Sequence, residues 1–187
     1  MTKPKTKGLR WVGFEYGWYS PSLAELNDRF ENTFRGERIG TNDYLSLGIG
    51  LPTPGNNRAG FFFAYWDGGL KEGVSTLKLN MIILSGEVSF GIIRIPNRAI
   101  FSPGLIIRDV FGWWTFKSAG IDTTEFSLVM DIGAKGTAEY YPVKNIGIKL
   151  DFGWLAWGLD LMHLLGEDKI KLQTPGNILK LGVNFYY

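Results

Sequence analysis

The sequence predicts an all-β fold: an eight-stranded antiparallel up-and-down barrel that spans a membrane and carries a short amphipathic helix in its first loop. Segments in which apolar and polar residues alternate recur along the chain, as they do in strands with one apolar and one polar side. Aromatic residues make up 15% of the chain and glycines number 25, which is typical of closed antiparallel barrels. The last ten residues, 178–187, form one more alternating strand and end in aromatic residues.

The composition restricts the class of protein further. A chain of 187 residues is long enough for one domain and not comfortably for two, so a single domain is expected, residues 1–187. The net charge of +2 and the lack of a basic run argue against nucleic acid as a partner. Without cysteine, and without phosphate-loop, EF-hand or zinc spacing, neither a cofactor nor a metal is expected. Residues 1–11 have no apolar core of the kind found in signal peptides, so we expect such a segment to be missing from this sequence.

The first predicted strand, residues 8–19, is followed by a helical pattern. Ser20, Pro21 and Ser22 resemble a helix start, and Ser22 and Glu25 are spaced as a capping box. About three helical turns ending near Gly36 would then place four apolar residues on one face, namely Leu23, Leu26, Phe30 and Phe34. This helix is expected either to pack on the rim of the barrel or to act as a lid or partner-docking helix.

The second predicted strand covers residues 41–51, and a turn over 52–58 leads to the third, residues 60–66. The orientation of the third strand stays open because aromatic residues lie on both of its faces. In the fourth segment, 74–95, the apolar residues change parity at Ser85 and Gly86. Because a shift of one residue exchanges the two faces of a strand, we predict a bulge there, with a tight hairpin as the alternative.

The remaining strands are predicted over residues 104–116, 124–141, 146–154 and 178–187, with turns at 96–104 and 142–145 and a long excursion at 155–173. The adjacent residues Arg108 and Asp109 require either that one charge face the apolar side or that another bulge exist. An even number of strands places both ends of the barrel chain on one side, where the turns are compact.

The residue types on the two faces indicate which face is inside. The polar face is rich in glycine, which suits the crowded interior of an eight-stranded barrel, so the bulky apolar face should meet hydrocarbon. The residues predicted to face lipid are Leu45, Leu47, Ile49, Phe126, Leu128, Ile146, Ile148, Leu150, Leu179, Leu181 and Val183. Charged residues predicted to pair inside the lumen, or to form a proton or ion path, are Glu15, Lys78, Asp131, Lys135, Glu139, Lys149, Asp151 and Lys180.

The terminal strand carries a pattern of a polar residue, a glycine and two aromatic residues: Lys180, Gly182, Phe185 and Tyr187. This pattern resembles the C-terminal targeting strand of bacterial outer-membrane β-barrels, and the resemblance implies that the outer-membrane assembly machinery reads it. The chain as a whole resembles the small eight-stranded outer-membrane barrels, such as the transmembrane domain of outer membrane protein A. That resemblance implies a plugged barrel surrounded by membrane lipid in the bacterial outer membrane, with loops that reach surface or envelope partners.

The resulting functional hypothesis is a structural or surface-interaction protein for adhesion or the envelope, rather than a wide pore or an enzyme. One alternative is a lipid-modifying enzyme of the outer membrane, with the single histidine, His163, as its candidate catalytic residue. Asp160 and Asp168 are close to His163 in sequence, but no serine is. Another alternative is a soluble lipocalin-like carrier of an apolar ligand, because alternation by itself is common to both kinds of barrel.

Overall fold

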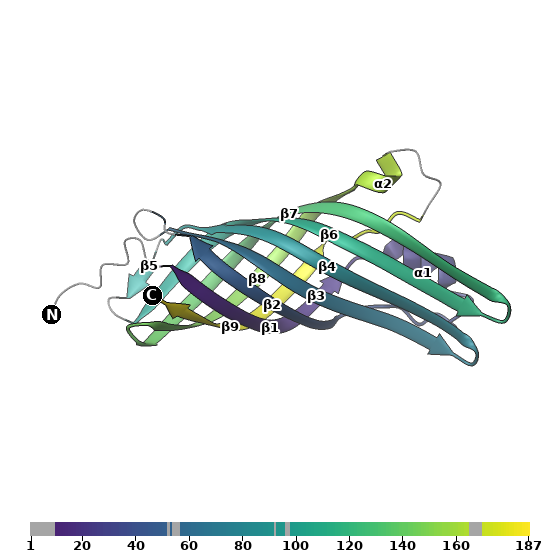
Figure 1. Ribbon diagram of the computed structural model, residues 1–187, viewed down its shortest axis with the longest axis horizontal. Helices are drawn as coiled ribbons and strands as arrows, with labels where there is room; N and C mark the ends of the chain where they lie inside the picture. The colour runs from purple at the N-terminus through teal and green to yellow at the C-terminus, as the bar shows by residue number, and fades with distance from the viewer. Residues whose placement is uncertain (1–9, 52, 54–56, 92, 96–97, 165–169) are drawn as a thin grey trace.

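Eight long antiparallel strands form one closed barrel in the computed structural model, which describes residues 10–51, 53, 57–91, 93–95, 98–164 and 170–187 (Figure 1). The strands of the wall are β1 (Trp11–Pro21), β2 (Asn42–Leu51), β3 (Arg58–Glu72), β4 (Ser75–Ser89), β6 (Ala99–Ser118), β7 (Ile121–Val143), β8 (Ile146–Asp160) and β9 (Gly176–Tyr186). The short β5 (Ile93–Ile95) pairs with the start of β6. The predicted fold class is confirmed.

The pairing of strands closes the barrel with a shear of ten residues. A path of paired residues that starts at Trp11 and crosses each strand in turn returns to β1 at Pro21, ten residues further along. Such a barrel has strands tilted by about 40° and an interior just wide enough for side chains. Because the path rises by ten residues over eight crossings, it rises by about 1.25 residues at each crossing. The height of a residue above Trp11 is therefore the rise of the path at its strand plus the number of residues by which it lies above the path, and heights can be compared between strands.

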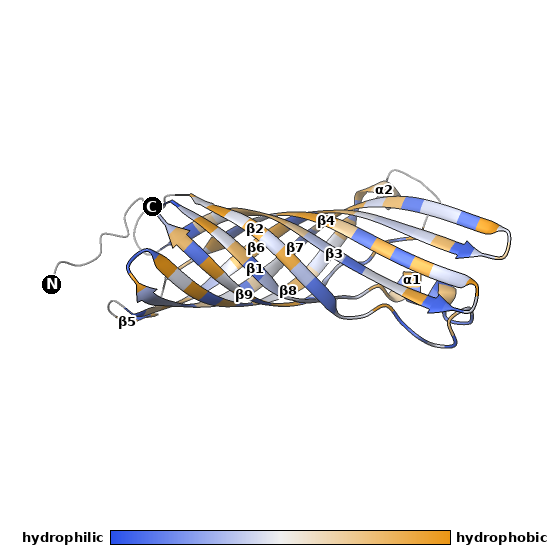
Figure 2. Ribbon diagram, turned by 60° about the horizontal axis from the view of Figure 1, so that its bottom comes forward, coloured by the Kyte–Doolittle hydropathy of each residue, from blue (hydrophilic) through white to orange (hydrophobic). Residues whose placement is uncertain are grey.

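Along the strands, buried and exposed residues alternate, and the exposed ones are largely apolar in the body of the barrel (Figure 2). On β3 this alternation settles the open orientation: Phe61, Phe63 and Tyr65 point outward, whereas Phe62 and Trp66 are buried. The wall of the barrel therefore has its bulky apolar side on the outside.

The upper part of β4 differs from the prediction. Leu77, Leu79 and Met81 are fully buried, whereas Lys78 between them is exposed. The register with β3 and β6 continues without a shift through Ser85, so the predicted bulge and the alternative hairpin are both wrong. The predicted lumen position of Lys78 is wrong for the same reason. The strand keeps its phase, but the residues on its inward face are apolar above the level of Ser85 and polar from Ser85 downward.

Helix α1 (Ala24–Phe30) is shorter than predicted, and the residues that follow it form turns. The predicted capping box is wrong, because the helix has Leu23 at its N-cap and no side-chain cap. Instead, the backbone N–H of Ser22 donates to Pro175, and a carboxylate oxygen of Glu25 accepts a hydrogen bond from the N–H of Lys171 at 3.1 Å. Both contacts join the first outer loop to the last one.

The four apolar residues predicted for this helical segment, Leu23, Leu26, Phe30 and Phe34, are buried in one cluster with side chains of the barrel wall. The Phe30 ring lies 5.6 Å from that of Trp114 and 4.7 Å from that of Phe116. The helix therefore packs into the outer end of the barrel. Among the described residues, no helix is long and apolar enough to cross a membrane.

Several strands are longer than predicted. β3 begins at Arg58 and continues through Gly68 and Gly69, where the sequence predicts its end. β6 begins at Ala99, inside the predicted turn 96–104, although residues 96 and 97 lie outside the described part of the chain. In both places the neighbouring strand supplies a continuous ladder of partners, which outweighs the local turn signal of glycine or proline.

Candidate functional site

The lumen of the barrel is filled by ionisable side chains from most of its strands. In the described part of the chain, five cationic and five anionic residues form ion pairs inside it, so the formal charges of this paired set cancel. These residues are Arg58, Arg108, Lys135, Lys149 and Lys180, and Glu15, Glu87, Asp131, Glu139 and Asp151. A buried charge is costly unless it is paired, and every one of the ten lies within ion-pair distance of an opposite charge.

The middle layer joins three carboxylates and three ammonium groups: Glu15, Glu87, Asp151, Lys135, Lys149 and Lys180. The Lys180 ammonium lies 2.7 Å from Glu15 and 2.9 Å from Glu87. The Lys149 ammonium lies 3.0 Å from Asp151 and also pairs with Glu15. Because each ammonium group contacts more than one carboxylate, the six side chains form one network that fills this level of the lumen.

The lower layer closes the end of the barrel at which β1 begins and β9 ends (Figure 1). Arg58 pairs with Glu139, and its guanidinium carbon lies 5.6 Å from the ring centres of both Tyr141 and Tyr186. Glu139 also accepts hydrogen bonds from the two tyrosine hydroxyls, at 3.0 Å and 2.5 Å, and from the Asn184 amide at 3.0 Å. The Glu139 carboxylate is therefore shared among four side chains.

The upper layer ties the last outer loop to the wall. Arg108 on β6 pairs with Asp131 on β7 at 2.6 Å and donates to the Tyr19 hydroxyl at 2.7 Å. Thr174, which precedes β9, donates its hydroxyl to Asp131 at 2.7 Å, and its carbonyl accepts the Tyr19 hydroxyl. Above this layer the interior is largely apolar and is occupied by α1 and by Ile170 and Leu172 of the same loop, where the Leu172 N–H donates to the buried Asp160 carboxylate at 2.9 Å.

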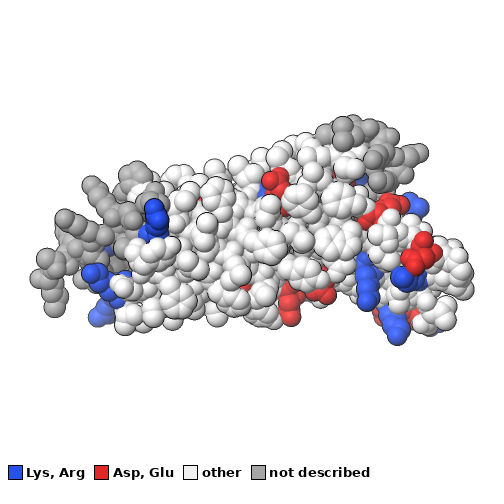
Figure 3. Space-filling model, in the orientation of Figure 1, with Lys and Arg blue, Asp and Glu red and all other residues white. Residues whose placement is uncertain are grey.

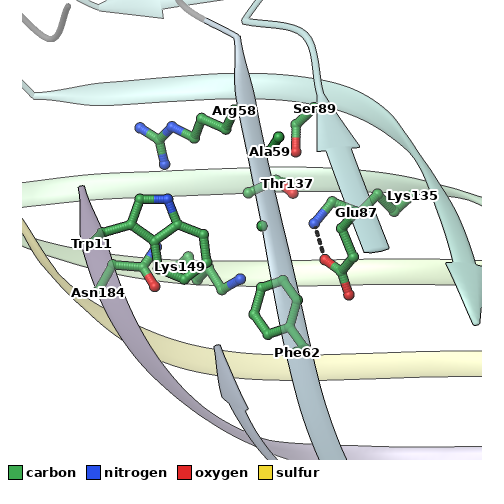
Figure 4. Close-up of a pocket in the computed structure, with 11 residues that line it drawn as sticks. Trp11, Arg58, Ala59, Phe62, Glu87, Ser89, Lys135, Thr137, Lys149 and Asn184 are labelled. Atoms are coloured by element: carbon green, nitrogen blue, oxygen red, sulfur yellow. Dashed lines mark hydrogen bonds and ion pairs between the residues drawn. The ribbon is translucent and has the colours of Figure 1, made fainter. Parts of the chain in front are cut away.

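Two aromatic rings, those of Trp11 and Phe62, lie beside the charges at the lower side of the middle layer (Figure 4). The Lys149 ammonium lies 4.7 Å from the Phe62 ring centre and 5.6 Å from that of Trp11, and it points between them. Across from these rings, Lys135 pairs with Glu87 at 2.5 Å. A small pocket between the two groups is lined by Trp11, Arg58, Phe62, Glu87, Lys135 and Lys149 among others.

Glycines make room for the large lumen rings. A side chain at Gly50 would occupy the position of the Trp11 indole, and one at Gly48 would overlap the Phe62 ring. Glycine at these two positions is therefore a steric requirement of the filled lumen. This is the crowding expected from the glycine-rich polar face.

Seven of the eight residues predicted for the lumen lie inside it, and Lys78 does not. Three further members of the ion-paired set are absent from the prediction. The sequence pattern assigns Arg58 to a turn, places Glu87 on the polar face without including it in the network, and leaves the orientation of Arg108 open. Strict period-two counting from Ser85 to Ser89 would have found Glu87, and Asp109 proves to be the outward member of the Arg108–Asp109 pair.

On the face of the barrel seen in Figure 3, the outer wall between the two ends carries few charges. Eight of the eleven residues predicted to face lipid are exposed, from Leu179 at 40% to Leu181 at 57%. The other three, Leu128, Ile146 and Val183, are half-buried on the same outward face. Outward-facing residues below Asp43 and Asp67 form an apolar belt, as expected for outer-membrane barrels, whose apolar band is about 25 Å tall.

The remaining candidate residues are those of the proposed assembly signal, which lie on both faces of β9 or at the end of the chain, and His163. Of the proposed assembly signal, Lys180 and Gly182 are buried, whereas Phe185 and Tyr187 are exposed. His163 lies in α2 (Leu161–Leu164), and its side chain is outside the described part of the structure. Among the described residues no group of His, Asp and Glu could hold a metal ion.

The sequence matches no protein-family model and no curated protein, but the fold matches solved structures. A major outer membrane protein from Thermus thermophilus matches with a TM-score of 0.61 at 11% identity, covering 96% of this chain and 99% of that one. The attachment invasion locus protein Ail of Yersinia pestis, in complex with the heparin analogue sucrose octasulfate, gives a TM-score of 0.58 at 11% identity, with 97% and 99% covered. The N-terminal β-barrel domain of Pseudomonas aeruginosa OprF gives 0.50 at 17% identity, with 97% and 100% covered.

The chain therefore has the fold of the small bacterial outer-membrane barrels, as the resemblance in its sequence implied. Its apolar belt and its ionic interior are what a barrel in hydrocarbon requires, because a lipid-facing wall must be apolar and closed. The fold and the belt together define a transmembrane β-barrel.

Proposed function

We propose that this protein is an integral barrel of the bacterial outer membrane whose lumen is closed by paired charges, and that it acts as a structural or surface-interaction protein. The observation that carries the proposal is the combination of an apolar belt on the outside with ten paired charges on the inside. A wide pore needs a water-filled lumen, whereas here three ionic layers and an apolar plug follow one another along the axis.

The outer end supports a surface role. The hairpins β3–β4 and β6–β7 extend beyond the belt and pair with each other through β4 and β6 up to Thr76 and Lys117. They form a four-stranded platform whose inner side is filled by α1. Ail, which shares the fold, was solved with a heparin analogue, and a surface partner of this kind is proposed here for the outer loops.

Two further partners follow from the proposal. Membrane lipid would surround the belt, and the outer-membrane assembly machinery would recognise the terminal strand through Lys180, Gly182, Phe185 and Tyr187. In the folded barrel Phe185 is 53% exposed and Tyr187 is 68% exposed, so both rings would lie at the lipid boundary where aromatic residues collect.

Refolding tests the proposal. Protein unfolded in urea is diluted into detergent micelles or into plain buffer, and folding is followed by heat-dependent gel mobility and circular dichroism. We expect a heat-modifiable β-barrel in micelles and aggregation in buffer. Folding in buffer alone as a monodisperse monomer would instead support the soluble carrier. In planar bilayers we expect at most a narrow conductance, and a large steady conductance would contradict the closed lumen.

The enzyme alternative has its own test. His163→Ala protein, refolded in the same micelles, is compared with the unaltered protein for acyl transfer to and hydrolysis of lipid substrates. Our proposal expects that neither protein shows such activity. An activity lost on replacing His163 would contradict the non-enzymatic role.

A further inference from the structure

The apolar belt does not end at the same height all around the barrel. On β2, β3 and β9 the outward-facing apolar residues stop below Asp43, Asp67 and Asn177, which lie about 8 to 10 residues above Trp11. These polar residues mark where the wall on this side of the barrel leaves hydrocarbon.

On β7 the outward apolar series continues above that height. Ile132, Met130, Leu128 and Phe126 follow one another on the outward face, and Phe126 lies about 13 residues above Trp11. At the same height on the opposite side of the barrel, the outward residue of β3 is Lys71. Phe126 and Lys71 are thus matched in height and opposite in polarity.

The lower end of β7 shows the complementary difference. Its outward residues there are Ala134, Gly136 and Ala138, at heights where β2 presents Leu47 and Ile49. The band of bulky apolar residues is therefore shifted toward the outer end on β7 relative to β2. Such a band is oblique to the barrel axis.

We infer that the barrel stands tilted in the bilayer, with its β7 side inclined into the outer leaflet, so that lipid covers Phe126, Leu128 and Met130. The inference rests on the proposed membrane location. A bilayer is a flat slab, and an oblique apolar band fits a slab when the barrel leans toward the side on which the band is higher. The occupant of the surface is lipid, because the apolar series on β7 continues without a polar residue from the belt into it.

Asp109 on β6 limits how far the barrel leans. It points outward at about the height of Asp43 and is the neighbour of Met130 across the β6–β7 pair. With lipid covering Phe126, Asp109 would lie within the outer leaflet below the interface, where a carboxylate costs less than at the midplane but still disfavours a greater lean toward β6. The barrel therefore leans toward β7 and β8 and not toward β6. On β8 the outward residue at this level is an aromatic one, Trp157, which is 52% exposed.

Site-directed spin labelling tests the tilt, and the absence of native cysteine makes the labels unique. The variants Phe126→Cys and Lys71→Cys carry labels at matched heights on opposite sides, and Leu47→Cys is the reference within the belt. Each barrel is reconstituted in phosphatidylcholine vesicles after its heat-dependent gel mobility has confirmed folding. We expect the ratio of oxygen to nickel-chelate accessibility to be severalfold higher at 126 than at 71, and close to the value at 47.

An equal, aqueous ratio at 126 and 71 would overturn the tilt while leaving the membrane location intact, provided that position 47 reports lipid. An aqueous ratio at 47 would reject the membrane location and the tilt together. Shielding of position 126 from both reagents that disappears on dilution with lipid would assign the surface to a second copy of the chain and overturn the inference. Leu128→Cys takes the place of Phe126→Cys if that variant does not fold.

Discussion

Arg108 and Asp131 form an ion pair of 2.6 Å in which both side chains are completely buried. The pair joins β6 to β7 and, through the Thr174 hydroxyl and Tyr19, holds the last outer loop against the inner wall. The pair thus lies at the boundary between the ionic lumen below and the apolar plug above. Removing either partner leaves an uncompensated charge at that boundary.

We therefore expect Arg108→Met to lower the free energy of unfolding by about 3–5 kcal/mol, because Asp131 is left buried without its cation. The double variant Arg108→Met/Asp131→Leu should lose less than Arg108→Met alone, since it leaves no unpaired buried charge at this site. Urea titration of the barrel in vesicles, followed by tryptophan fluorescence, measures both. Asp109→Asn is the control, because Asp109 is adjacent in sequence but points outward. Equal losses for Arg108→Met and the control would contradict this view of the pair.

The two lysines predicted for the same lumen network make a second test. Lys180 contacts Glu15 and Glu87, whereas Lys78 is exposed on the outside. Lys180→Met should cost about 3–5 kcal/mol of unfolding free energy, while Lys78→Met should change it by less than about 0.5 kcal/mol. The same titration measures both, and a similar cost at the two positions would mean that the network does not hold the lumen together.

The plug formed by α1 should protect the outer end from proteases. Phe30→Ala removes the ring that packs on Trp114 and Phe116, at an expected cost of about 3–5 kcal/mol for a buried aromatic residue. Since the lost contacts are local, the outer loop should be cut by trypsin in intact vesicles while the belt stays folded. Arg29→Ala, a change at an exposed position of the same helix, should leave the loop resistant, apart from the loss of one cleavage site. Resistance of the Phe30→Ala protein would contradict the plug.

The crowding at Gly50 can be measured directly. Gly50→Ala places a methyl group where the Trp11 indole lies, so it should cost about 1–3 kcal/mol of stability as overpacking does. Gly136→Ala is the matched control, because nothing lies within 4 Å of a side chain at that outward-facing position. In the Trp11→Leu background, Gly50→Ala should cost much less, because the indole that the methyl group meets is gone. A double-mutant cycle measures this difference as the interaction energy between the two positions. A neutral Gly50→Ala would mean that the indole has room elsewhere in the lumen.

Much of the barrel could be predicted because alternation survives in the amino-acid sequence. Within the belt, strands such as β2 and β9 have one bulky and one small or polar side, so the positions of Leu47 and Lys180 follow from counting by two. The glycines showed which side is the inner one, because a solvated surface does not require repeated glycine whereas a crowded interior does. In the structure, Gly48 and Gly50 make room for the Phe62 and Trp11 rings. Both arguments need no information on neighbouring strands.

The prediction for Lys78 is wrong because the barrel has a polar interior only within the belt, whereas its interior above the belt is largely apolar. Within hydrocarbon the charged residues must lie inside, but beyond it water is outside and the apolar side chains Leu77 and Leu79 turn inward to cover α1. The strand itself gives no sign of where it leaves the membrane. The change in apolar parity at Ser85 therefore resembles a bulge, although the backbone continues regularly there.

By itself, the sequence determined that the chain forms alternating strands with a glycine-rich inner side and a bulky outer side, because those properties depend on residue type and on a period of two. Only the tertiary structure decided which charges meet, as with Arg58 and Glu139, which are 81 residues apart in the chain of 187. It also decided where each strand leaves the belt. Both depend on the register of every strand against its neighbours, and a barrel acquires that register only when it closes.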